Sequence, residues 1–212
     1  MEQVRPNTLT KAEAQAGWKL LFDGETAEGW RGFRSEDFPD GWQVQQGSIV
    51  RAAGGGDIIT EEQFTNFELR LEWKISEGGN SGIFFRVDEL HDHVWQTGAE
   101  MQVLDDERHA DGKSPFTSAG ANYALHRPQI STVLPAGEWN HVRLLVDGDH
   151  VEHWLNGVKI VDYTLWGDEW NDLVANSKFS GMPDYGRNKS GHIALQDHGD
   201  LVWFRNIKIR EL

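Results

Sequence analysis

The stretch NHVRLLVDGDHVEHWLNGVKIVDYTL, from Asn140 to Leu165, decides the fold. Apolar and polar residues alternate within each of its three short segments, which is the two-residue period of a half-buried β-strand. The dipeptides Asp147-Gly148 and Asn156-Gly157 separate the segments, and such dipeptides between alternating segments are strong hairpin signals. The stretch therefore predicts three consecutive antiparallel strands.

The same kind of pattern covers most of the remaining chain. Further segments with alternation or a short apolar run are WKLLFDG, WQVQQGSIVRA, DIITEEQF, FELRLEWKIS, SGIFFRV, AEMQVL, GHIALQDHG and VWFRNIKIREL. Glycine-containing turns separate these segments, and we find no repeat, linker or low-complexity tract between them. Roughly ten strands with regular turns predict a single all-β domain over residues 1–212, a jelly-roll sandwich of two antiparallel sheets.

Two places in the chain favour a short helix. Residues 1–17 form an N-terminal extension in which Thr10 precedes Glu13 by three positions, the spacing of a capping box. The run LWGDEWNDLVANSKF favours a second helix around Glu169 to Ala175. We expect one or two short helices beside the two sheets.

Composition restricts the kind of partner. The formal net charge is -14 over 212 residues, which argues against binding nucleic acid or an anionic membrane surface. No apolar run is long enough to cross a bilayer, so we expect no membrane insertion. The chain has no cysteine, which excludes disulfides and thiolate metal sites. A neutral small-molecule partner is favoured.

Several strands carry unexpected polar residues on the face opposite their apolar one. In GAEMQVLD these are Glu100 and Gln102, in NSGIFFRV the residue is Arg86, and in GHIALQDHG they include Gln196 and His198. A surface salt bridge and exposed histidines would explain them, and so would a polar floor on a rigid scaffold. The polar segment 105–129 is long enough to be functional, and one of Trp95, Trp166 and Trp170 could be a stacking surface.

The segments GWKLLFDGETAEGW, NSGIFFRV, GAEMQVLDD, SKF and GHIALQDHG, in this order, resemble the 3-keto-disaccharide hydrolase family, and the resemblance runs from about Trp18 to Leu212. Members are bacterial secreted or periplasmic proteins with a concanavalin-like jelly roll. The resemblance therefore implies a periplasmic or secreted location, a carbohydrate substrate and cleavage of 3-keto-glycosides. In that reaction a base removes the proton at C2, the C1 substituent leaves by β-elimination, and water adds to the product.

The resemblance also implies roles for residues in the matching segments. His198 or His109 could be the base, Arg86 or Lys178 could steady the enolate, and Glu100 and Asp105 could be acid, base or oxygen ligands to a divalent cation. The expected catalytic residues are Glu100, His198, Asp105, Arg86 and Lys178. The expected substrate-binding residues are Gln102, Gln196, Asn80, His109, Tyr123 and His153.

Two rival functions stay open, because a fold does not settle an activity. A lectin-like domain would use the same amides and Glu100 only to hydrogen-bond sugar hydroxyls. A conventional glycosidase would instead need two opposed carboxylates across one cleft.

Overall fold

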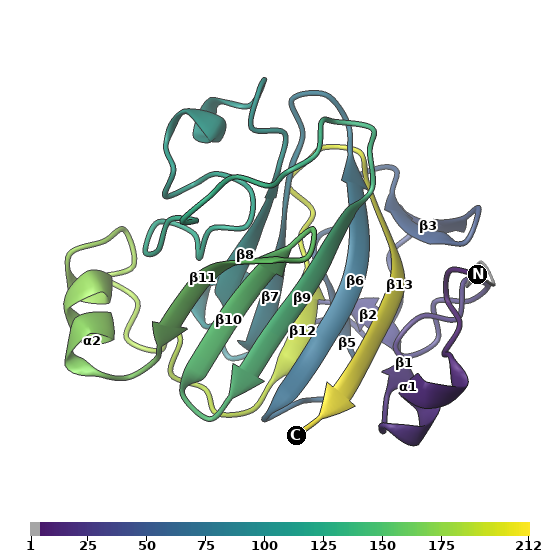
Figure 1. Ribbon diagram of the computed structural model, residues 1–212, viewed down its shortest axis with the longest axis horizontal. Helices are drawn as coiled ribbons and strands as arrows, with labels where there is room; N and C mark the ends of the chain where they lie inside the picture. The colour runs from purple at the N-terminus through teal and green to yellow at the C-terminus, as the bar shows by residue number, and fades with distance from the viewer. Residues whose placement is uncertain (1–4) are drawn as a thin grey trace.

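In the computed structural model, which describes residues 5–212, the chain forms two antiparallel β-sheets that pack face to face (Figure 1). The larger sheet has eight strands in the order β11-β10-β9-β6-β13-β4-β3, with β1 paired to β13. The smaller sheet has five strands in the order β2-β5-β12-β7-β8. The predicted all-β sandwich is therefore confirmed.

The elements have the following bounds. The larger sheet contains β1 (Lys19–Leu20), β3 (Trp42–Gln45), β4 (Ser48–Arg51), β6 (Phe67–Ile75), β9 (Asn140–Asp147), β10 (His150–Leu155), β11 (Val158–Thr164) and β13 (Val202–Glu211). The smaller sheet contains β2 (Trp30–Gly32), β5 (Ile58–Thr60), β7 (Asn80–Val87), β8 (Ala99–Leu104) and β12 (His192–Leu195). The helices are α1 (Lys11–Gln15) and α2 (Asp168–Ala175), with 3₁₀ turns η1 (Val94–Gln96) and η2 (Ala110–Lys113).

The two predicted hairpins join β9 to β10 and β10 to β11. His150 lies opposite Asp147, and Leu155 lies opposite Val158, so each loop has two residues. Asn156 and Gly157 both have positive φ, 51° and 83°, as the tight hairpin turn that matches strand twist requires. The Asn156-Gly157 signal marks the second loop itself, whereas the first loop is Gly148-Asp149, because Asp147 is the last residue of β9 and pairs with His150.

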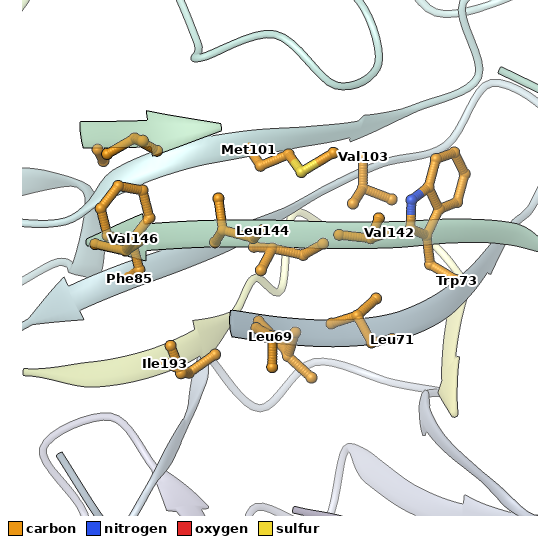
Figure 2. Close-up of a cluster of buried hydrophobic side chains, with 14 of the residues drawn as sticks. Leu69, Leu71, Trp73, Phe85, Met101, Val103, Val142, Leu144, Val146 and Ile193 are labelled. Carbon is orange, nitrogen blue, oxygen red and sulfur yellow. The ribbon is translucent and has the colours of Figure 1, made fainter. Parts of the chain in front are cut away.

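The core lies between the two sheets. Figure 2 shows Met101 and Val103 from β8 facing Leu144 and Val142 from β9, with Leu69 of β6 in the same apolar layer. Alternate residues of each strand fill this layer, so the remaining side chains of the five-stranded sheet project away from the larger sheet. We call that second surface the outer face of the five-stranded sheet.

Both expected helices are present, and neither is long. The hydroxyl of Thr10 accepts from the backbone N–H of Glu13, and the Glu13 carboxylate accepts from the Thr10 N–H, so the predicted capping box is confirmed. The first four residues of the N-terminal extension lie outside the described residues. Among residues 5–212, no helix has both the length and the apolar character needed to cross a membrane.

Candidate active site

Polar residues of neighbouring strands meet on the outer face of the five-stranded sheet. Glu100 and Gln102 project there from β8, because the residues between them belong to the core. Gln102 lies opposite Gly82 of β7, and on the far side of Gly82 the backbone N–H of Gln196 donates to its carbonyl at 3.0 Å. Side chains from β8 and from the end of β12 therefore flank a glycine.

A cavity of ≈ 270 Å³ is lined by these side chains. Three segments enclose it: η1, the long loop between β8 and β9, and the segment that follows α2. Its lining residues are Asn80, Trp95, Glu100, Gln102, Tyr123, Lys178, Phe179, Met182, Gln196 and His198. The structure thus brings together seven of the residues expected from sequence: Asn80, Glu100, Gln102, Tyr123, Lys178, Gln196 and His198.

Gly82 leaves room for the Glu100 side chain, which lines the cavity. A Cβ atom at this position would come within 2.3 Å of Glu100 Oε1 and 2.9 Å of the Phe84 ring. The Glu100 side chain therefore lies across β7 in the space that any larger residue at position 82 would fill. Glycine is needed here for close approach, since the φ of Gly82 is not in the left-handed region.

Glu100 is a buried carboxyl, 7% exposed. Burial raises its pKa to about 8, because a carboxylate loses its hydration there. The positive charge of Lys178 opposes this shift, and the negative charges of Asp57 and Asp111 add to it. Glu100 is consequently protonated at neutral pH and can donate a proton to a ligand in the cavity.

Three amide oxygens in the lining are buried without a hydrogen-bond partner among residues 5–212. They are Asn80 Oδ1, Gln102 Oε1 and Gln196 Oε1, one from each of three adjacent segments of the sheet. The Gln102 amide nitrogen donates to the Thr117 carbonyl at 3.2 Å, which leaves its oxygen free for a ligand. Buried acceptors of this kind are normally satisfied, so their grouping here fits a ligand that donates several hydrogen bonds, such as a polyol.

Lys178 and Tyr123 form the opposite wall. The Lys178 ammonium lies 4.5 Å from the centroid of the Tyr123 ring, and Lys178 is the one lysine or arginine of the described residues that lines the cavity. The Tyr123 hydroxyl donates to Asp111 Oδ2 at 3.0 Å, and burial together with that carboxylate raises the pKa of Tyr123 above its usual value. Tyr123 is thus a fixed neutral group, and the cation above it faces the cavity.

Arg86 does not lie in the cavity, so the expectation that it faces the same hollow as Glu100 is wrong. Its guanidinium donates to the carbonyls of Thr65 (2.6 Å) and Gly148 (2.9 Å), which connect β7 to loops of the larger sheet. The reason is a β-bulge: one extra residue on β7 opposes β12, and Arg86 has a φ of 53°. A bulge reverses the side-chain alternation beyond it, which a strict two-residue period cannot show.

Three other expected residues also lie outside the lining. Asp105 accepts from the N–H of Gly78 at 2.7 Å and shapes the turn before β7. His153 lies in the larger sheet with Nδ1 2.9 Å from the Gly120 carbonyl oxygen, and burial lowers its pKa to about 4. The ring of His109 stands 6.2 Å from that of His198, beside the cavity, and its Nδ1 accepts from the Asp111 N–H.

Some lining residues could not be selected from sequence. Phe179 and Met182 lie in an irregular segment without periodicity, next to the lysine that the family resemblance does mark. Trp95 was one of three stacking candidates. It lines the cavity, whereas Trp170 is buried in the core and Trp166 lies 5.4 Å from the Arg86 guanidinium.

A divalent cation stays a prediction. Glu100, an expected oxygen ligand, lines the cavity with His198 and the unpartnered amide oxygens, and this oxygen-rich donor set suits a hard cation. Asp105 is not part of that set. Elsewhere in the described residues, His150, Glu152 and Asp162 also cluster, but the Lys159 ammonium already pairs with both carboxylates.

Comparison with known proteins assigns the chain to a family. Residues 17–210 match the 3-keto-alpha-glucoside-1,2-lyase-like domain. A 3-keto-disaccharide hydrolase of Bacteroides thetaiotaomicron is 35% identical over 228 residues, covering 92% of this chain and 79% of that protein. A solved structure from Parabacteroides distasonis is 37% identical with a TM-score of 0.92, covering 98% of this chain and 100% of the other.

A more distant match supports the fold alone. The carbohydrate-binding module CBM66 of Bacillus subtilis is 14% identical with a TM-score of 0.55, over 86% of this chain and 96% of that one. The family predicted from the sequence motifs is therefore confirmed, and the chain belongs to the 3-keto-disaccharide hydrolase family, whose members carry the 3-keto-alpha-glucoside-1,2-lyase-like domain.

Proposed function

We propose that this protein cleaves 3-keto-glycosides by elimination and hydration, with Glu100, Lys178 and His198 as the reacting groups. The observation that carries the proposal is a buried carboxyl that is protonated at neutral pH and shares one small cavity with an ammonium and an imidazole. Family membership supports the class of reaction.

The chemistry begins at C2 of the sugar. A ketone at C3 acidifies the C2–H bond, because the electron pair left behind delocalises onto the ketone oxygen as an enolate. The His198 imidazole accepts this proton, since an imidazole nitrogen is a common general base in enzymes. The Lys178 ammonium stabilises the enolate oxygen in a site where few water molecules compete with it.

Cleavage follows when the enolate collapses. The electron pair forms a C1–C2 double bond, the C3 carbonyl re-forms, and the C1–O bond breaks. Glu100 donates its proton to the departing oxygen, so the leaving group departs as a neutral alcohol. Water then adds across the double bond, with its oxygen at C1 and a proton at C2, which completes a net hydrolysis.

The amide oxygens supply binding. Sugar hydroxyls are donors, and the unpartnered oxygens of Asn80, Gln102 and Gln196 are acceptors on the cavity floor. The indole of Trp95 offers an apolar surface at the edge of the same cavity. These groups would hold a sugar ring in the cavity with the reacting residues around it.

The test is to incubate the protein with a methyl 3-keto-glucoside and with its unoxidised parent and to separate the products by chromatography. We expect release of methanol and 3-keto-glucose from the keto-sugar alone, with deuterium from D₂O incorporated at C2. Cleavage of the parent glycoside would favour a conventional glycosidase. Binding of either sugar without turnover would favour a lectin and overturn the proposal.

The periplasmic or secreted location implied by the family resemblance belongs to the same proposal. It can be checked by fractionating cells that express the natural gene.

A further inference from the structure

Asp57, a residue outside the cavity lining, stands on the same sheet face as the proposed acid. It directly precedes β5, where Ile58 is in the main core and Ile59 belongs to a second apolar cluster on the outer face. Leu195 lies opposite Ile58, so continued antiparallel pairing places Gln196 beside Asp57. A single row therefore crosses four strands in the order Gln102, Gly82, Gln196 and Asp57.

Asp57 holds the chain between two residues of the cavity. Its Oδ1 accepts from the backbone N–H of Asp197 at 2.8 Å, and Asp197 stands between Gln196 and His198. The Asp197 carboxylate is bound in turn by Arg51 Nε at 2.6 Å and by the N–H groups of Gly55 and Gly56, at 2.9 and 3.0 Å. This short irregular segment after β12 is thus fixed through both its backbone and its side chain.

We propose that Asp57 is a positioning residue of this site, which fixes the segment carrying Gln196 and His198 through its hydrogen bond from the Asp197 N–H. The proposal rests on the proposed function, because it assigns Asp57 to the support of the same reaction. It adds a second carboxyl, on a different strand from the proposed acid and without contact with the substrate.

The test compares Asp57→Asn, Asp57→Ala and Asp106→Ala. Asp106 is the matched control, because its carboxylate also accepts one backbone N–H, from Ala119 at 2.7 Å, yet it lies outside the cavity lining. Two readouts are used. One is kcat and KM on the methyl 3-keto-glucoside, and the other is the ¹H–¹⁵N spectrum, in which the Asp197 N–H and the Gln196 side-chain amide report the position of the segment.

Asp57→Asn keeps an oxygen for the Asp197 N–H. We expect its kcat to stay within about threefold of wild type, with the two amide signals in place. Asp57→Ala removes the acceptor, so kcat falls about tenfold and both signals move, because a buried N–H is left unpaired. Asp106→Ala leaves kcat and the two signals unchanged.

The outcomes separate this inference from the proposed function. Failure of the wild-type protein to cleave the keto-sugar would overturn the function, while the ¹H–¹⁵N spectra would still show whether Asp57 holds the segment. Equal kcat for folded Asp57→Ala and Asp57→Asn, or unmoved Asp197 and Gln196 signals in Asp57→Ala, would overturn the positioning role. An equal loss of kcat in Asp106→Ala would show that the effect is not specific to Asp57.

Discussion

Glu68 and Glu100 are both buried glutamates on the exposed sides of their sheets, yet their surroundings are opposite. Glu68 lies on β6 of the larger sheet at 2% exposure, and Glu100 lies on β8 of the smaller sheet at 7%. Three arginines bind Glu68: Arg70 at 2.7 Å, Arg143 at 2.8 Å and Arg210 at 2.7 Å. Glu100 faces the cavity and a lysine instead.

The difference appears in how each carboxyl titrates. Burial alone would raise the pKa of Glu68, but hydrogen bonds from Arg143 and Arg70 outweigh burial and lower it. Burial dominates at Glu100 and raises its pKa to about 8. Burial therefore does not identify a chemically active carboxyl, whereas burial without bound partners does.

The largest expected effect comes from exchanging Glu100 for glutamine. Glu100→Gln removes the proposed proton donor but keeps the shape of the side chain. We expect kcat to fall about a thousandfold, within the range typical of lost general acid catalysis. The melting temperature should hold or rise, because the variant no longer buries an ionisable group without a partner. Steady-state kinetics and a thermal melt measure both, and turnover within tenfold of wild type would contradict the assignment.

The same exchange at Glu68 should do the reverse. Glu68→Gln leaves three arginines clustered without their carboxylate, and removing one member of a buried ion pair costs about 3–5 kcal/mol. The arginine side chains are 29–43% exposed, so solvent screening reduces the expected loss to about 2–3 kcal/mol. Urea unfolding checks this value. The kcat of the folded variant should equal that of wild type. A loss of activity without a loss of stability would contradict the assignment of Glu68 to stability and of Glu100 to the reaction.

These two glutamates also show what a sequence can and cannot predict. Both stand in alternating segments, FELRLEWKIS and GAEMQVLD, and the two-residue period correctly places both on the polar side of a strand. Nothing in either segment tells which carboxylate meets arginines, because Arg143 and Arg210 come from strands about 75 and 142 residues away. Partners at such separations follow from sheet order, which local patterns leave undetermined.

The candidate site residues show the same limit: local patterns place some of them, and the rest depend on how the strands pair. Residues on regular strands, such as Gln102 and Asn80, were placed correctly by alternation or by the family motifs. Arg86 was misplaced because a single-residue bulge is invisible to a periodic pattern. Asp57 was not selected at all, since its hydrogen bond from the Asp197 N–H joins residues that lie 140 positions apart in the chain.

The pH dependence of stability should separate the two carboxyls further. Glu100 has a raised pKa in the folded state, so between about 4.5 and about 8 the folded protein holds a proton that the unfolded chain has lost. Stability therefore falls as pH rises through this window, by about 1.4 kcal/mol per pH unit from this group. Glu68 acts in the opposite sense, because its lowered pKa adds stability that is lost as the solution is acidified below about 4.5.

Urea unfolding of wild type and Glu100→Gln at pH 5, 6 and 7 tests the first slope. We expect the free energy of unfolding of the variant, relative to that of wild type, to increase at each pH step. A constant difference would show that Glu100 is ionised in the folded protein.

The smallest expected effect comes from replacing one of the three arginines that bind Glu68. Among the three arginines that bind Glu68, Arg70 has the most exposed side chain, at 43%. Arg143 and Arg210 still bind the Glu68 carboxylate when Arg70 is replaced. Arg70→Met should cost less than about 1 kcal/mol, because the methionine keeps apolar contact with the Trp18 ring, over which the guanidinium lies 4.5 Å from the centroid. A matched urea series with Arg143→Met, whose guanidinium also bonds Glu152, should show the larger loss. If Arg70→Met instead costs as much as Glu68→Gln, the Glu68 carboxylate depends on a single arginine, and the contrast with Glu100 rests on that one partner.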